Sequence, residues 1–304
     1  MRFFPRRGRK LLIYFDNVLS YQRNERSGIG AETMDTWRKQ MKKAWIILLA
    51  FVLLLACFMG CAKKEDKPAA RTFTAGFDAE FPPFGFIADD GSYDGFDLAV
   101  AEEACKRLGW TFKAQPINWD AKDNELASGN IDCIWNGFTI EGREDDYTWS
   151  PSYYDSSIVV VVKAGSDIAT LADLTGKTVI VQAASSGLSA LDDNPELVET
   201  FKELLECADY NSAFSELGMG SVDAVVADVG VAAYNMKGKT DQYTVLEEKI
   251  SVETYGIGFL KGQDELMNQV WAKVQEIAKD GTMAKIADKY VSYGLVKENV
   301  TLIG

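Results

Sequence analysis

The sequence predicts an α/β fold made of two successive sets of strands and helices. From Arg71 onward, short apolar runs alternate with amphipathic helical patterns, which is typical of α/β architecture. Two further helical patterns, at 264–279 and 282–290, end the chain. A chain of 304 residues with 47% hydrophobic and 25% charged residues is long enough for one or two globular domains.

The first set of elements is best defined by its helix, in which four apolar residues share one face before Gly109 stops the pattern. The elements expected here, in chain order, are a strand at 72–76, the helix at 96–108, a strand at 110–114, a short helix around 123–127, and an apolar strand at 131–135 followed by a loop at 136–139.

The second set begins with a β-branched run at 158–163, which predicts a buried strand. The elements expected after it are a short segment at 171–174, a strand at 178–182, a helix from about Ser186, a helix at 196–205, a strand at 222–228 and a strand-like run at 255–259. The order of the two sets favours strands that are buried between helices.

The N-terminal part has the composition of an export signal. Met41-Lys42-Lys43 precedes the 16 apolar residues 44–59, a run that is short for a membrane span. Gly60-Cys61 and a charged linker over 61–71 follow. Residues 41–60 therefore resemble a bacterial lipoprotein signal peptide with Cys61 as the acylated residue. Cys57 is an alternative acylation site, and an uncleaved anchor helix is an alternative to cleavage.

Residues 1–40 precede a signal that is already complete. We therefore expect translation to start at Met41, with residues 1–40 an upstream artefact or an unstructured segment.

Charge and composition exclude several classes of function. The residues before Cys61 carry a net charge of +7 within a total of −13, which leaves −20 on the remainder. Such an acidic body repels phosphate backbones, so nucleic-acid binding is excluded. Histidine is absent from the sequence, which removes histidine-based catalysis and histidine-containing zinc sites. We expect no cofactor and no metal site.

The five cysteines do not have the spacing of a disulfide framework. Cys105 and Cys133 are expected to be small buried apolar residues. A disulfide that includes Cys207 remains open.

Six stretches carry a resemblance to the type II periplasmic binding proteins for amino acids. They are Asp78 to Phe84, Tyr93 to Ala99, Asn136 to Ile140 with Arg143, Val181 to Gly187, Val222 to Val225 with Asp228, and Tyr255 to Gly258. The resemblance implies a two-lobe fold with two crossing hinge strands, near 158–162 and 253–257. Residues 72–157 and 258–304 would form the first lobe, and 158–257 the second.

The resemblance also implies a set of ligand-binding residues. Arg143 would bind the ligand carboxylate through its planar fork, and Asp228 would accept the α-ammonium group. Phe81 and Trp119 would enclose the ligand. Further contacts would come from Asp78, Asn136, Gly137, Thr139, Gln182, Ser185 and Ser186.

Each of these assignments has a plainer alternative. Arg143 lies among four acidic residues and would otherwise be a surface arginine, whereas Ser185, Ser186 and Asp228 would otherwise be helix N-caps. Phe81 and Trp119 would otherwise belong to the core. The family has one more residue between the glycine and the arginine than lies here between Gly137 and Arg143, which leaves the geometry of Arg143 open.

The implied function is capture of a free amino acid, with Asp78 favouring a polar or basic one, and delivery to the permease and ATPase of an ABC importer. We expect a monomer outside the cytoplasm that is held to the membrane by its lipid. A ligand-sensing module and, less favoured, a dehydratase-like enzyme on the same fold are the alternatives. No residue is isolated as a catalytic acid or base.

Overall fold

The computed structural model describes residues 36–45 and 71–303, which fall into two units, 1–67 and 68–304. The expected signal cysteines Cys57 and Cys61 and most of residues 1–40 lie outside the described residues. In the first unit a helix covers 36–45. Within the described ranges, no helix combines the length and apolar character needed to cross a membrane.

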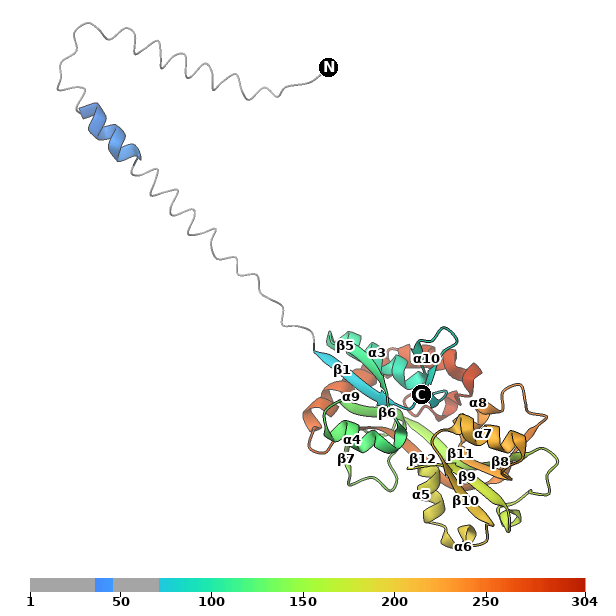
Figure 1. Cartoon of the computed structure of the whole chain (residues 1–304). Coiled ribbons are helices and arrows are strands. Elements are labelled where there is room, and N and C mark those ends of the chain that lie inside the picture. The colour runs from blue at the N-terminus through green and yellow to red at the C-terminus, as the bar shows by residue number, and fades with distance from the viewer. Residues whose placement is uncertain (1–35, 46–70, 304) are drawn as a thin grey trace, which may run out of the picture. The chain divides into compact units, whose positions relative to one another are not determined.

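One nine-stranded sheet forms the framework of the second unit (Figure 1). Its order is β10-β9-β11-β8-β12-β6-β1-β5, with β7 paired to β12. The strands are β1 (Thr72–Phe77), β5 (Thr111–Pro116), β6 (Cys133–Thr139), β7 (Tyr147–Trp149), β8 (Tyr154–Lys163), β9 (Thr178–Gln182), β10 (Glu203–Cys207), β11 (Ala224–Asp228) and β12 (Tyr243–Leu260). A small antiparallel sheet contains β2 (Glu80–Phe81), β3 (Gly85–Ile87) and β4 (Tyr93–Asp94).

Two strands at the middle of the large sheet connect its two halves. β8 and β12 pair antiparallel with each other, whereas β1 pairs parallel with β5 and β6, and β9 pairs parallel with β10 and β11. Each half is therefore a parallel α/β unit. β8 and β12 are the two crossing strands of a two-lobe α/β fold, as expected.

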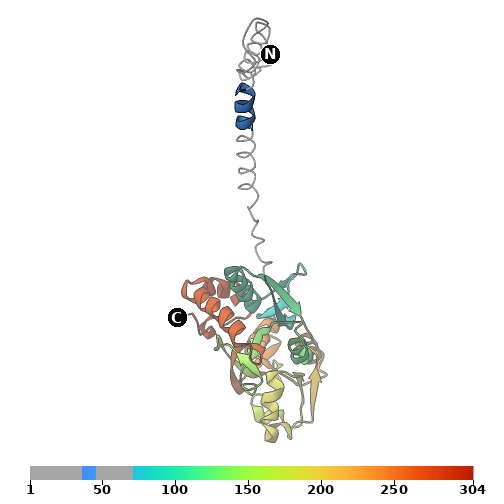
Figure 2. The same ribbon diagram turned by 90° about the vertical axis from the view of Figure 1, so that its left-hand side faces the viewer.

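Helices cover both halves of the sheet (Figures 1 and 2). The α-helices are α3 (Phe96–Leu108), α4 (Lys122–Ala127), α5 (Ser186–Asp192), α6 (Pro195–Val198), α7 (Tyr210–Met219), α8 (Val229–Asn235), α9 (Asp264–Lys279) and α10 (Thr282–Tyr290). Short 3₁₀ turns are η1 (Trp119–Ala121), η2 (Leu171–Leu174), η3 (Val291–Tyr293) and η4 (Lys297–Asn299). α9 and α10 pack on α3, so the end of the chain completes the lobe that its start began.

Three clusters of buried side chains form the core. The largest contains Phe73, Phe96 and Trp271 among its members, a second packs around Val160 and Val179, and a third around Phe138. Cys105 and Cys133 are buried and unbonded, as expected, and Cys207 is also a free thiol.

Two expected elements are wrong. Residues 136–139 do not form a loop but continue β6, because they pair with β12, where Tyr255 faces Thr139 and Gly256 faces Phe138. The helix expected over 196–205 is a single turn, α6, followed by β10, which extends the sheet by pairing with β9. In both places pairing between distant segments overrides the local pattern.

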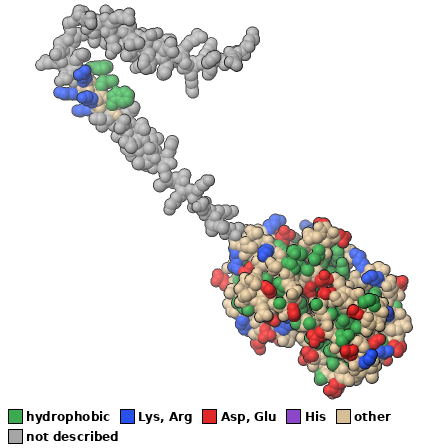
Figure 3. Space-filling view, viewed as in Figure 1, with side chains coloured by type: hydrophobic (Ala, Val, Ile, Leu, Met, Phe, Trp, Pro, Cys, Tyr) green, Lys and Arg blue, Asp and Glu red, His purple; other side chains and the backbone are tan. Residues whose placement is uncertain are grey.

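Acidic side chains lie across the face of both lobes that Figure 3 shows. This distribution agrees with the negative charge that the sequence assigns to the region after Cys61.

Candidate functional site

The expected site residues follow from where strands end in each lobe. Asp78 comes directly after β1, Arg143 follows β6, Gln182 ends β9, and Asp228 ends β11. Ligand sites in α/β sheets form at the carboxyl ends of parallel strands. The topology therefore directs side chains of both lobes to one region beside β8 and β12.

A hydrogen bond joins the two lobes at the side of this region. The Gln182 amide Nε2 donates to Asp78 Oδ2 at 2.6 Å, and the backbone N–H of Glu80 donates to Asp78 Oδ1 at 2.8 Å. Both side chains are buried, and burial raises the pKa of Asp78. Asp78 and Gln182 are thus brought together, as a ligand pocket built from both lobes requires.

Two cations of the first lobe meet one carbonyl oxygen of the second. Arg143 Nη2 and Lys122 Nζ each lie 3.4 Å from the carbonyl oxygen of Ala184, and Arg143 Nη1 lies 3.3 Å from that of Thr139. Lys122 is 4% exposed. Its pKa is lowered by burial and by the nearby Arg143. These long contacts to neutral oxygens leave both cations able to bind an anion.

The backbone of Ala184 is held in the left-handed region, with φ of 54°. This conformation is uncommon for a residue other than glycine and costs free energy. It occurs where the chain turns from β9 into α5, and the carbonyl oxygen that results faces Arg143 and Lys122.

Two buried carboxylates, Asp228 and Glu253, lie near the Thr139 side chain. Glu253 Oε2 accepts a hydrogen bond from Thr139 Oγ1 at 2.7 Å. The Tyr255 hydroxyl lies 2.5 Å from Asp228 Oδ1 and 3.3 Å from Glu253 Oε1. Burial, together with the adjacent Glu253, raises the pKa of Asp228 well above its ordinary value. Thr139 thus connects the group that includes Arg143 to the group that includes Asp228.

Among the described residues, the two groups form few ion pairs. In the part of the chain described, no carboxylate forms an ion pair with Arg143, and no cation forms one with Asp228 or Glu253. Lys122 has only Asp123, which is 3.9 Å away and mostly exposed. Buried charges without partners are costly, so this arrangement suits a ligand that carries both a negative and a positive group.

Aromatic rings surround the same region. Phe81 packs against Phe84 and Tyr210, with ring centroids 6.0 Å apart in both pairs. Trp119 packs edge-to-face on Phe138, and Lys122 Nζ lies 5.4 Å from the Trp119 ring centroid. Both expected aromatic residues are therefore buried and have core-like contacts. Their contact with a ligand stays a prediction.

Gly137 and Asn136 lie in the middle of β6. Gly137 has φ of 56°, and a Cβ atom at this position would come within 3.0 Å of the rings of Phe81 and Tyr255. Only glycine permits this backbone conformation at such close range. The Asn136 side chain is turned the other way, against Gly85.

Ser185 and Asp228 could each have been a helix N-cap by sequence, and the structure shows a side-chain cap bond for Ser185 but not for Asp228. Ser185 does cap α5, because its hydroxyl accepts the N–H of Leu188 at 3.1 Å and donates to the carbonyl oxygen of Gln182. Asp228 precedes α8 but makes no side-chain cap bond; its carboxylate accepts the Tyr255 hydroxyl instead. Ser186 is the first residue of α5 and is half-buried.

The sequence reasoning missed Lys122 and Glu253. Lys122 is three residues after Trp119, a spacing that puts both side chains on one side of a helical turn. Glu253 is two residues before Tyr255 in an extended strand, so both side chains point to the same face. These two spacings can be read from the sequence. Glu253 was nevertheless overlooked, because it follows a charged run at 247–249 that is typical of a solvated strand.

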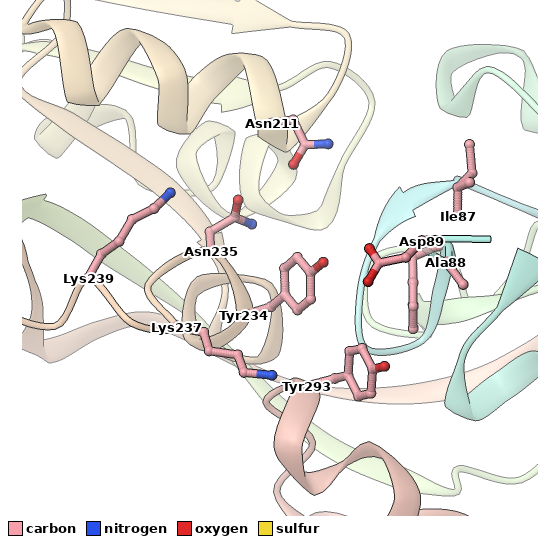
Figure 4. A pocket seen from close by; sticks show the side chains of 10 residues that line it. Ile87, Ala88, Asp89, Asn211, Tyr234, Asn235, Lys237, Lys239 and Tyr293 are labelled. Atoms are coloured by element: carbon pink, nitrogen blue, oxygen red, sulfur yellow. The ribbon is translucent and has the colours of Figure 1, made fainter. Parts of the chain in front are cut away.

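A separate hollow of about 460 Å³ lies elsewhere between the lobes (Figure 4). Tyr234 and Lys237 line it from the end of α8, and Asp89 and Tyr293 line it from the first lobe. None of the described residues expected to bind ligand lines this hollow. It is therefore distinct from the region around Arg143 and Asp228.

The described residues contain no group of three or more His, Cys, Asp or Glu side chains arranged to hold a metal ion. The site is made of two cations, two buried carboxylates and aromatic rings, and its residues come from both lobes. It has the composition of a receptor for a small zwitterion.

The chain belongs to the bacterial extracellular solute-binding proteins, family 3, whose model matches residues 73–293. Its relatives include amino-acid-binding proteins of ABC transporters, which are transport proteins and not enzymes. The L-cystine-binding protein TcyJ of Escherichia coli strain K12 is 30% identical over 229 residues, which cover 74% of this chain and 85% of that protein.

Two solved structures show the same fold. One is a substrate-binding protein of an ABC uptake transporter from Streptococcus pneumoniae with bound histidine, with a TM-score of 0.70 and 33% identity over 74% of this chain and 94% of that one. The other is an ancestral arginine-binding protein bound to glutamine, with a TM-score of 0.68 and 35% identity over 74% of this chain and 99% of that one.

Proposed function

We propose that this protein captures one free L-amino acid between its lobes, 72–157 with 258–304 and 158–257, and delivers it to the permease of an ABC importer. The observation that carries the proposal is a pair of charged groups joined through Thr139: half-buried Arg143 with buried Lys122, and buried Asp228 with buried Glu253. A zwitterion supplies the charge that each group lacks.

Each group has a defined role in this capture. The guanidinium fork of Arg143 binds the α-carboxylate, with Lys122 as a second cation beside it. Asp228 accepts the α-ammonium group. Phe81, Trp119 and Tyr210 exclude water, while Asp78 and Gln182 contact the side chain of the ligand, which favours a polar or basic amino acid.

A thermal-shift panel tests the capture. The purified protein is heated with each common L-amino acid and with L-cystine. An amino acid present at about 100 times its dissociation constant should add roughly 2.7 kcal/mol to the free energy of unfolding. The matching D-amino acid is the control, and a panel in which no compound raises the melting temperature contradicts the proposal.

We further propose that the protein is a monomeric lipoprotein outside the cytoplasm, acylated on Cys61 after removal of the signal peptide 41–60. The support is the sequence around this residue, a basic start and an apolar run that ends before a charged linker. A second lipid chain or a second signal is needed for stable anchoring, because one acyl chain holds weakly.

Metabolic labelling with an alkyne fatty acid distinguishes the two candidate cysteines. Cys61→Ser is expected to abolish the label and release the protein from the membrane, whereas Cys57→Ser retains it. Loss of the label in Cys57→Ser alone would move the acylation site to Cys57.

A further inference from the structure

Asp228 and Glu253 form a buried carboxylate pair. Asp228, at the end of β11, is 1% exposed, and Glu253, in the crossing strand β12, is 4% exposed. The hydroxyl groups of Tyr255 and Thr139 contact the pair directly. The Ser156 hydroxyl lies 2.8 Å from Tyr255 Oη and completes the group.

The hydrogen bonds around Tyr255 are more numerous than its one proton can supply. Its hydroxyl lies near Asp228 Oδ1, Glu253 Oε1 and Ser156 Oγ, and a phenol donates one hydrogen bond only. The contact to Glu253 at 3.3 Å and the contact to Asp228 at 2.5 Å cannot both be donated by Tyr255. A proton on the carboxylate pair would supply the missing donor.

Electrostatics leads to the same requirement. Tyr154 in β8, Tyr210 in α7 and Tyr255 in β12 are the titratable groups packed around the pair, and burial raises the pKa of all three, so that they stay neutral. Arg143 is linked to the pair through the backbone and side chain of Thr139. Burial and the adjacent Glu253 raise the pKa of Asp228 well above its ordinary value, which favours a proton held between the two carboxylates.

We propose that Glu253 is a second acceptor for the ligand's ammonium group, and that the Asp228–Glu253 pair releases its shared proton to solvent when this group binds. The inference rests on the proposed capture of an amino acid. The ammonium group brings three N–H donors and one positive charge, which take over the role of the shared proton. The proton leaves to buffer, and the ligand remains an ammonium ion.

The proposal has a consequence for affinity. If binding releases one proton, the association constant rises with pH by up to about tenfold per pH unit until the ligand-free pair has ionised. The alternative is that Glu253 serves only as the acceptor of the Thr139 hydroxyl, which fixes β12 against β6. In that case binding releases no proton.

Isothermal titration calorimetry with L-arginine, L-histidine, L-glutamine and L-cystine counts the protons. Each titration is carried out near neutral pH in phosphate and in Tris, whose ionisation enthalpies differ. For each amino acid that binds, the wild-type protein is expected to release close to one proton per ligand. Glu253→Gln keeps an acceptor for Thr139, and its proton release should fall to near zero with a loss of the pH dependence.

Two control variants assign the proton to the pair. Glu247→Gln removes an exposed carboxylate from the same strand and should leave the proton count unchanged. Asp78→Asn removes another buried carboxylate of the proposed site, and it should still release the proton even if its affinity falls.

Infrared difference spectroscopy observes the proton directly. Adding the amino acid should remove the carbonyl stretch of a protonated carboxyl group in the wild-type protein but not in Glu253→Gln. Binding without proton release, or equal release by Glu253→Gln and wild type, overturns the role of Glu253 and leaves amino-acid capture intact. If none of the four binds, the titrations use the amino acid that raises the melting temperature in the thermal-shift panel, and a panel without any such amino acid contradicts the ammonium site together with the capture.

The shared proton is tested separately in the ligand-free protein. A group whose pKa is raised by folding makes the free energy of unfolding fall as pH rises from the unfolded to the folded pKa. The slope should be smaller in Glu253→Gln than in wild type and unchanged in Glu247→Gln. Equal slopes in all three proteins contradict the shared proton, whether or not any amino acid binds.

Discussion

The contacts of Arg143 show how the role of a single side chain depends on segments that are distant in the sequence. Arg143 could not be separated from a surface arginine by the sequence, because four acidic residues surround it. In the structure those carboxylates do not pair with it, and the Arg143 guanidinium reaches the second lobe at Ala184. The contacts of a long side chain depend on which distant segment the fold brings near, and local sequence does not contain that information.

Removing either charge of the proposed site should abolish tight binding. Arg143→Ala or Asp228→Asn leaves one end of the bound zwitterion without its partner, at a cost of about 3–5 kcal/mol. Calorimetric titration with the amino acid found in the panel measures the loss, and circular dichroism checks that the fold is kept. Arg71→Ala, which removes a partly exposed arginine paired with Asp132, is the matched control. Retained micromolar affinity in Arg143→Ala or Asp228→Asn contradicts these roles.

Asp97 should make the protein less stable as pH rises. Its carboxylate is fully buried in the first turn of α3 and accepts the N–H of Gly137 at 2.6 Å and the hydroxyl of Tyr153 at 2.7 Å. Burial raises its pKa to about 7 from 3.8. Between these values the folded protein holds a proton that the unfolded chain has lost, so the free energy of unfolding falls across this range and is level above it.

Asp97→Asn tests this sign. Urea unfolding at a series of pH values should show a shallower decrease from about pH 4 to about pH 7 in the variant than in the wild type. An unchanged slope would mean that Asp97 is ionised throughout.

Secondary-structure elements were predictable where the sequence pattern is local. The helices at 96–108, 264–279 and 282–290 have the predicted bounds, because each has an apolar face at helical spacing. β6 and β10 were mispredicted at 136–139 and 196–205, since their pairing with β12 and β9 decides their conformation. The small sheet β2-β3-β4 was also missed, because its strands are only two or three residues long.

The start of α5 is a test at the scale of an element. Ser185→Ala removes the side-chain cap at Leu188 and should cost about 1 kcal/mol of stability. It should also weaken amino-acid binding, since the cap fixes the turn that presents Ala184 to Arg143 and Lys122. Thr170→Ala, which removes the capping box of η2, should cost a similar amount of stability without affecting the affinity. Equal affinities in Ser185→Ala and Thr170→Ala would contradict a role of the Ser185 cap in amino-acid binding.

The whole molecule is expected to close when it binds. The lobes are connected through β8 and β12, and ligand contacts from both lobes favour the closed arrangement over the open one. Small-angle X-ray scattering should show a smaller radius of gyration when the cognate amino acid is added. Asp228→Asn is the control and should show no change at the same concentration. An unchanged radius in the wild-type protein contradicts closure in solution.

The return of α9 and α10 to α3 also determines the order in which the molecule can be assembled. When the chain emerges with its N-terminus leading, the second lobe, 158–257, is complete before the first lobe has received α9 and α10. The apolar faces of β1 and α3 therefore stay uncovered until the residues near the C-terminus have been synthesised. A protein exported in this direction therefore needs shielding of its first-made half until the last helices arrive.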